Sequence, residues 1–152
     1  MEYSGDEVAG VVDSFEALTR AELRQALAEL AFKRGEDAEP GEFDEVIDEA
    51  IRAYQLIRIE GEQSLLVVGP AAFPVRPEGT ADLQHILDVE DRDIDRERAG
   101  EAAVERVREE AALAVEMGDT DTIEALIDVS YEIESWAPVD VADLRTYLDE
   151  RA

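Results

Sequence analysis

The stretch that decides the fold is LIRIEGEQSLLVV, residues 56–68. Two β-prone runs, residues 56–60 and 64–68, flank the tripeptide Gly61-Glu62-Gln63. Short apolar runs joined by a few residues that include a glycine are typical of a β-hairpin. The second run is apolar on both faces of its strand, so we expect both of those faces to be covered.

Before the hairpin, apolar residues recur at helical spacing in three segments. The first segment predicts a helix near residues 5–18. The second begins at Thr19, which forms the pattern of a capping box with Glu22, and it ends at Gly35. The third predicts a helix whose inner face carries Phe43, Val46, Ile47, Ala50, Ile51 and Tyr54.

Three helices followed by a two-stranded hairpin is the order of elements in a winged helix-turn-helix. Residues 1–69 therefore resemble that superfamily in element order and in length, and no signature residue adds to the resemblance. The fold class that we predict is mainly α, a winged-helix-like three-helix unit with a β-hairpin, followed by a C-terminal helical extension.

The second half of the chain predicts a linking loop and then helices. Residues 70–79 are rich in proline and are bounded by two glycines, which excludes a helix or a central strand. Over residues 80–152 we expect a short turn capped by Thr80 or Asp82, a helix from about Asp95 to Met117 that Gly118 closes, a helix from Asp119–Asp121 to Trp136, and a last helix capped by Asp140.

The two long C-terminal helices should form an antiparallel helical hairpin. Their faces carry isoleucine, leucine, tyrosine and tryptophan, which need a cover. We therefore expect residues 80–152 to pack on the hairpin, on the first helix or on a second copy of the chain.

The charge of the chain is extreme. It holds 40 acidic residues against 14 basic ones, for a formal net charge of -26, and Lys33 is its one lysine. Such a charge would strain a fold at low salt, but molar salt shortens the Debye length to about 3 Å. The composition therefore indicates the cytosol of a halophile that accumulates salt. Neither a signal peptide nor an apolar stretch of membrane-spanning length is present, so we expect a cytoplasmic protein.

As a whole, the chain resembles the uncharacterised acidic protein families of haloarchaea. The resemblance covers nearly the full length. It rests on the stretches LTRAEL (residues 18–23), ELAFKRG (29–35), VVGP (67–70) followed by Phe73-Pro74, and HILD (85–88). It implies a haloarchaeal cytosol and brings no known activity with it.

Catalytic, cofactor and metal motifs are missing. The chain has no cysteine, which excludes disulfides and thiolate sites. His85 is the single histidine, and no serine stands in a nucleophile motif. The alternating acids of residues 91–95 suggest a calcium loop, but Arg96 and Ala102 stand where such a loop needs glycine and glutamate. We predict no enzyme, with no catalytic, cofactor-binding or metal-ligating residue.

The remaining question is whether the winged-helix-like unit binds DNA, since the third helix of that fold usually enters the major groove. Its outer face would present Asp44, Glu45, Asp48 and Glu49 with one base, Arg52. Other basic candidates are Arg20, Arg24 and Arg58. The acidic helix disfavours DNA. The leading hypothesis is a non-enzymatic protein-interaction or regulatory module that binds a protein partner or forms a homodimer. The alternative is a DNA-binding transcription regulator that uses Arg20, Arg24, Arg52 and Arg58.

Overall fold

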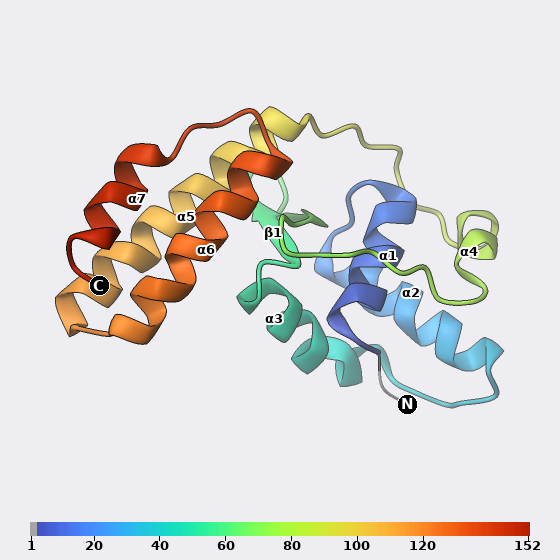
Figure 1. Cartoon of the computed structure of the whole chain (residues 1–152). Coiled ribbons are helices and arrows are strands. Elements are labelled where there is room, and N and C mark those ends of the chain that lie inside the picture. The colour runs from blue at the N-terminus through green and yellow to red at the C-terminus, as the bar shows by residue number, and fades with distance from the viewer. Residues whose placement is uncertain (1–2) are drawn as a thin grey trace. The chain divides into compact units, whose positions relative to one another are not determined.

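A computed structural model describes residues 3–152 of the chain (Figure 1). Over these residues it is mainly helical with one two-stranded antiparallel sheet, which confirms the predicted fold class. The chain divides into two compact units, one up to Ile94 and the other from Asp95 to Ala152. The elements in chain order are α1 Gly5–Phe15, α2 Arg20–Lys33, the 3₁₀ turn η1 Pro40–Phe43, α3 Asp44–Arg52, β1 Leu56–Ile59, β2 Leu65–Val68, α4 Thr80–Ile86, α5 Arg96–Met117, α6 Thr120–Trp136 and α7 Ala142–Asp149.

Local capping signals start the first two helices. The Thr19 hydroxyl accepts the Glu22 N–H at 3.1 Å, and the Glu22 carboxylate accepts the Thr19 N–H at 2.8 Å. The predicted capping box of α2 is therefore confirmed. Ser4 and Glu7 form a second box at the start of α1. Both boxes satisfy helix N–H groups that would otherwise lack a partner.

The first helix is shorter than predicted, because it ends at Phe15 and not near residue 18. Glu16 turns the chain with a φ of 68°, and the Ala17 N–H donates to the Phe15 carbonyl oxygen at 2.9 Å. Leu18 then exchanges two backbone hydrogen bonds with Leu66 of β2, at 3.1 and 2.7 Å. The chain leaves the helix here because its backbone groups pair with the hairpin instead.

The predicted hairpin is confirmed, with Leu56 of β1 opposite Val68 of β2. Leu66 belongs to the core of the first unit, and Leu65 and Val67 on the opposite face are also buried. Both faces of β2 are therefore covered, as its apolar sequence predicts. Just before the hairpin, α3 ends at Arg52, and Tyr54 is buried with a φ of 61°.

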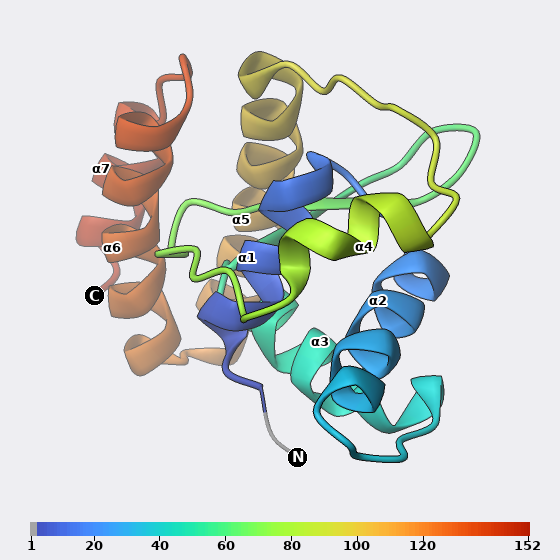
Figure 2. The same cartoon turned by 90° about the vertical axis from the view of Figure 1, so that its right-hand side faces the viewer.

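The first compact unit runs to Ile94, beyond the predicted linking loop of residues 70–79, and so includes α4. This helix packs against α1 and α2 (Figure 2), and its Leu83 is fully buried in the core of the unit. Neither Thr80 nor Asp82 caps it. Gly79 occupies the N-cap position with a φ of 93°, and the Thr80 hydroxyl donates to the Pro77 carbonyl oxygen at 2.6 Å. The expected packing of the C-terminal helices on the first unit stays a prediction.

In the second unit, α5 and α6 form the predicted helical hairpin across Gly118, whose φ is 66°. The buried side of α5 carries mostly small residues, and α7 contacts both long helices. A Cβ on Gly100 would lie only 2.6 Å from the Ala137 side chain, so this glycine permits a close approach. Asp140, predicted as the cap of α7, accepts the Ala142 N–H at 2.9 Å, although Val141 holds the N-cap position.

Candidate functional site

Two of the four candidate DNA-binding arginines are engaged by acids of the third helix. The Arg20 guanidinium contacts Asp44 at 3.0 Å and Asp48 at 2.6 Å. Arg24 donates to both carboxylate oxygens of Asp44, at 2.7 and 3.0 Å. The hydrogen bond from Arg24, followed by that from Arg20, lowers the pKa of Asp44 below its usual value. The structure therefore brings these two arginines together to join α2 to α3.

The other two arginine candidates lie elsewhere in the first unit. Arg52 is exposed in the last turn of α3. Arg58 projects from β1, where its guanidinium lies 3.9 Å from the Glu60 carboxylate. The four candidates are thus divided between the α2–α3 contact, the end of α3 and the hairpin.

The outer face of α3 remains acidic after these pairings. Glu45 and Glu49 are exposed, and neither forms an ion pair within residues 3–152. The face thus presents two acids that arginines neutralise and two that remain uncompensated. A DNA phosphate brought to this face would meet net negative charge.

Sequence reasoning missed a partly buried ion pair between Glu22 and Arg92. The Arg92 guanidinium donates to both Glu22 carboxylate oxygens, at 2.6 and 3.1 Å, and to the Ala17 carbonyl oxygen at 3.2 Å. Only 9% of the Arg92 side chain is exposed. This contact holds the segment after α4 against the start of α2. The partners are 70 residues apart in sequence, so no local pattern signals the pair.

The Glu22–Arg92 pair predicts a pH dependence. Burial by itself would raise the pKa of Glu22, but hydrogen bonds from Arg92 and from the Thr19 N–H outweigh it, and the pKa is lowered. A carboxyl group with a lowered pKa stabilises the fold above its unfolded pKa of about 4.3, and this contribution is lost as the pH falls through the folded pKa.

We therefore expect Glu22→Gln, which keeps the capping pattern but removes the charge, to cost about 1–3 kcal/mol at pH 7. Urea titrations between pH 7 and pH 3 should show the difference from wild type shrinking below about pH 4.3. Glu62→Gln, at an exposed position in the hairpin turn, is the control. A Glu22→Gln difference that stays constant with pH would contradict the prediction.

Arg92 also borders a polar hollow of about 540 Å³ between the end of α1 and residues 84–93. Gln84 donates to the Ser14 carbonyl oxygen at its edge, at 2.6 Å. The hollow contains acids of the segment that suggests a calcium loop, but within residues 3–152 no group of three acidic or histidine side chains could hold a metal ion. His85, on the adjacent α4, is exposed.

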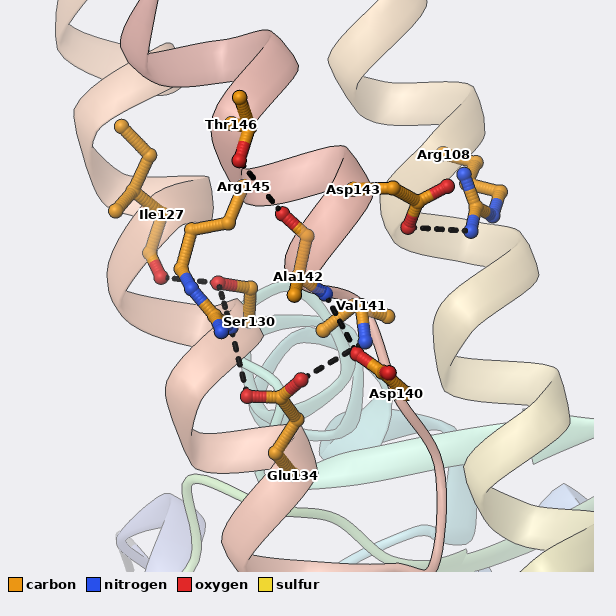
Figure 3. Close-up of polar contacts among 10 residues, drawn as sticks. All are labelled: Arg108, Ile127, Ser130, Glu134, Asp140, Val141, Ala142, Asp143, Arg145 and Thr146. Atoms are coloured by element: carbon orange, nitrogen blue, oxygen red, sulfur yellow. Dashed lines mark hydrogen bonds and ion pairs between the residues drawn. The ribbon is translucent and has the colours of Figure 1, made fainter.

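A second polar cluster ties α7 to α6 (Figure 3). Glu134 accepts from Arg145 at 2.8 Å and from the Val141 N–H at 2.9 Å. Arg145 also donates to the Ser130 hydroxyl at 3.3 Å and lies 4.0 Å from the centre of the Tyr131 ring. The Ser130 hydroxyl donates to the Ile127 carbonyl oxygen, so its hydrogen bond goes to the backbone and not to a general base. The polar groups of this cluster thus bond to one another and to the backbone, and they hold α7 against α6.

A groove of about 660 Å³ runs along α5 in the second unit. Its apolar lining comes from Val104, Ala112 and Val139. The Arg108 guanidinium, which also lines the groove, pairs with Asp143 of α7 at 3.4 Å, as Figure 3 shows. Acids supply the rest of the lining: Glu101, Glu105, Glu109 and Asp140.

Other apolar side chains of the second unit are exposed. Leu113 is 57% exposed and Met117 is 70% exposed, both near the end of α5. Tyr131 on α6 is 56% exposed. Among the described residues, no helix combines the length and apolarity needed to cross a bilayer.

The family model described as "Family of unknown function (DUF7109)" matches residues 6–152. The chain therefore belongs to that family, and the expected resemblance to an uncharacterised family is confirmed at this level. No curated protein and no solved structure matches the chain.

Proposed function

We propose that this protein is a non-enzymatic protein-interaction or regulatory module that works in a salt-rich cytosol. The observation that carries the proposal is the engagement of Arg20 and Arg24 by the acids of α3. A DNA-binding unit needs such cations for phosphates, whereas here they hold two helices together.

The second unit supports the proposal by offering apolar surface for a partner. Leu113, Met117 and Tyr131 are each more than half exposed, and the groove along α5 is partly apolar. Apolar and aromatic side chains near the centre of an interface supply most of its binding energy. The partner would be another protein or a second copy of this chain.

A DNA-binding regulator is the second candidate, and the arrangement of the first unit favours it. The Leu18–Leu66 bridge joins the loop between α1 and α2 to the hairpin, which fixes the hairpin beside the helices. Arg58 projects from that hairpin, and Arg52 lies at the end of α3. In this reading both side chains would contact duplex DNA.

Duplex binding by variants separates the two functions. We expect wild type not to bind genomic duplex fragments specifically, in fluorescence anisotropy at 0.2 M and 1 M KCl. Asp44→Asn combined with Asp48→Asn removes the acids that engage Arg20 and Arg24, so it is the variant most favourable to DNA. Specific binding by wild type that Arg52→Ala with Arg58→Ala abolishes would overturn the proposal.

The interaction reading has its own measurement. Sedimentation velocity, and cross-linking with mapping of the linked peptides, should place contacts with another chain on residues 95–152. Leu113→Ser with Met117→Ser removes two exposed apolar side chains and should weaken that association. Val75→Ser, at an exposed apolar position of the first unit, is the control. Association that depends on the first unit alone would contradict this assignment.

A further inference from the structure

The groove along α5 has the dimensions of a helix-binding site. Its lining runs from Glu101 to Ala112 on one face of α5 and includes Val139 and Asp140 after α6. At 1.5 Å per residue, that stretch of α5 is about 16 Å long, or roughly three helical turns. Grooves of this kind bind amphipathic helices through side chains spaced three or four residues apart.

The apolar part of the groove is made of small side chains. Val104 and Val139 are half-buried and Ala112 is exposed. The methylene stems of the glutamates and of Arg108 extend the apolar surface toward the rim. On this face of α5, Val104 and Ala112 are short and stand between longer charged side chains, so apolar side chains of another helix could enter between them.

The rim of the groove carries uncompensated negative charge. Glu101, Glu105 and Glu109 repeat every four residues, and none of the three forms an ion pair in the described part of the chain. Two nearby acids of the same unit do form ion pairs: Glu110 pairs with Arg106, and Asp143 pairs with Arg108. Like charges four residues apart on a helix repel each other. Cations of a partner in direct contact with these glutamates would relieve that repulsion, and pairs that the contact partly buries are screened by salt much less than exposed charges.

We propose that this groove binds a cationic amphipathic helix of a partner protein. The helix would place lysine or arginine side chains opposite Glu101, Glu105 and Glu109 and small apolar side chains against Val104, Ala112 and Val139. A second copy of the chain could still associate through Leu113 and Met117, but in this groove its excess of acids, 40 against 14 bases, would bring like charge to the rim. The inference rests on the proposed function and names the chemistry of one partner.

Two designed peptides test the proposal on the full chain. The probe is an 18-residue amphipathic helix of leucine, alanine and lysine, and the matched control replaces each lysine with glutamate. We expect saturable binding of the lysine peptide by isothermal titration calorimetry in 0.5 M KCl, and no binding of the glutamate peptide. Hydrogen exchange should show protection at residues 101–112 and 139–140.

Matched variants locate the charge. Glu101→Gln, Glu105→Gln and Glu109→Gln together should weaken the lysine peptide about tenfold, if each rim contact is of the strength typical of surface ion pairs. Glu116→Gln, Asp121→Asn and Glu124→Gln remove the same number of exposed acids from the same unit, outside the groove, and should leave the affinity unchanged. Circular dichroism checks that both triple variants fold.

Four results would overturn the proposal: no binding of the lysine peptide, equal binding of both peptides, equal weakening by both triple variants, or protection outside the groove. The experiments distinguish a wrong groove assignment from a wrong proposed function. If the lysine peptide does not bind while residues 95–152 still contact another chain through Leu113 and Met117, the groove assignment is wrong and the interaction module stands. If neither surface binds, both are wrong.

Discussion

Leu27→Ala is expected to destabilise the protein by about 2–5 kcal/mol, because it deletes a fully buried side chain from the core of the first unit. Leu27 lies on α2 among buried leucines and alanines, and it shares one hydrophobic core with residues of α1, α3 and the hairpin. Its removal leaves a cavity that the surrounding helices refill only in part, and this adds to the lost transfer free energy.

Urea unfolding followed by circular dichroism measures the effect, and hydrogen exchange of α2 amides assigns it to the first unit. Phe32→Ala is the matched control, because Phe32 is on the same helix but 70% exposed. It should change the free energy of unfolding by no more than about 0.5 kcal/mol. Equal effects of the two variants would mean that α2 does not pack by the face that the structure shows.

The second large effect is expected from salt. Two unit charges about 10 Å apart in water repel by about 0.4 kcal/mol before screening, and a net charge of -26 contributes many such pairs. At 0.1 M salt the Debye length is about 10 Å, so part of this repulsion between charges remains. At 1 M salt the Debye length is about 3 Å, and the repulsion is almost completely screened. Several kcal/mol of destabilisation would lower the melting temperature by about 10 °C or more.

Thermal melts between 0.1 M and 3 M KCl check this expectation. Sucrose at matched osmolality is the control, because it favours compact states without screening charge. The Glu101, Glu105 and Glu109 triple glutamine variant should show a weaker salt dependence, since it removes a row of like charges from one helix. A melting temperature that does not change with KCl would show that self-repulsion does not limit the fold, and would remove the argument for a salt-rich cytosol.

The ion pairs of α3 change the interpretation of its acidity. From the sequence, four acids on the outer face of the third helix form a repulsive surface. In the structure, Asp44 and Asp48 instead hold Arg20 and Arg24 and join α2 to α3. Such partly exposed ion pairs contribute modestly to stability. They also engage the guanidinium groups that would otherwise contact DNA phosphates. The geometry therefore weakens the case for DNA at this face more than composition alone does.

The sequence by itself determined the features whose signals are local. The capping box of Thr19 and Glu22, the turn at Gly118, and the hairpin of residues 56–68 all depend on residues a few positions apart. Helical and strand periodicity then placed the buried faces, since burial follows from which side chains share a face. The absence of cysteine and of a complete calcium-loop pattern is also readable without a structure.

Only the tertiary structure decided the features whose partners lie far apart in the chain. Leu18 leaves the helical pattern because Leu66 takes its backbone hydrogen bonds, and α4 joins the first unit because Leu83 is buried in that core. Arg92 binds Glu22, although the two residues are 70 positions apart in the sequence. In a chain with 40 acids, local sequence gives each arginine many equivalent candidates. The packing of distant elements selects among them, because it alone sets which charges come within hydrogen-bonding distance.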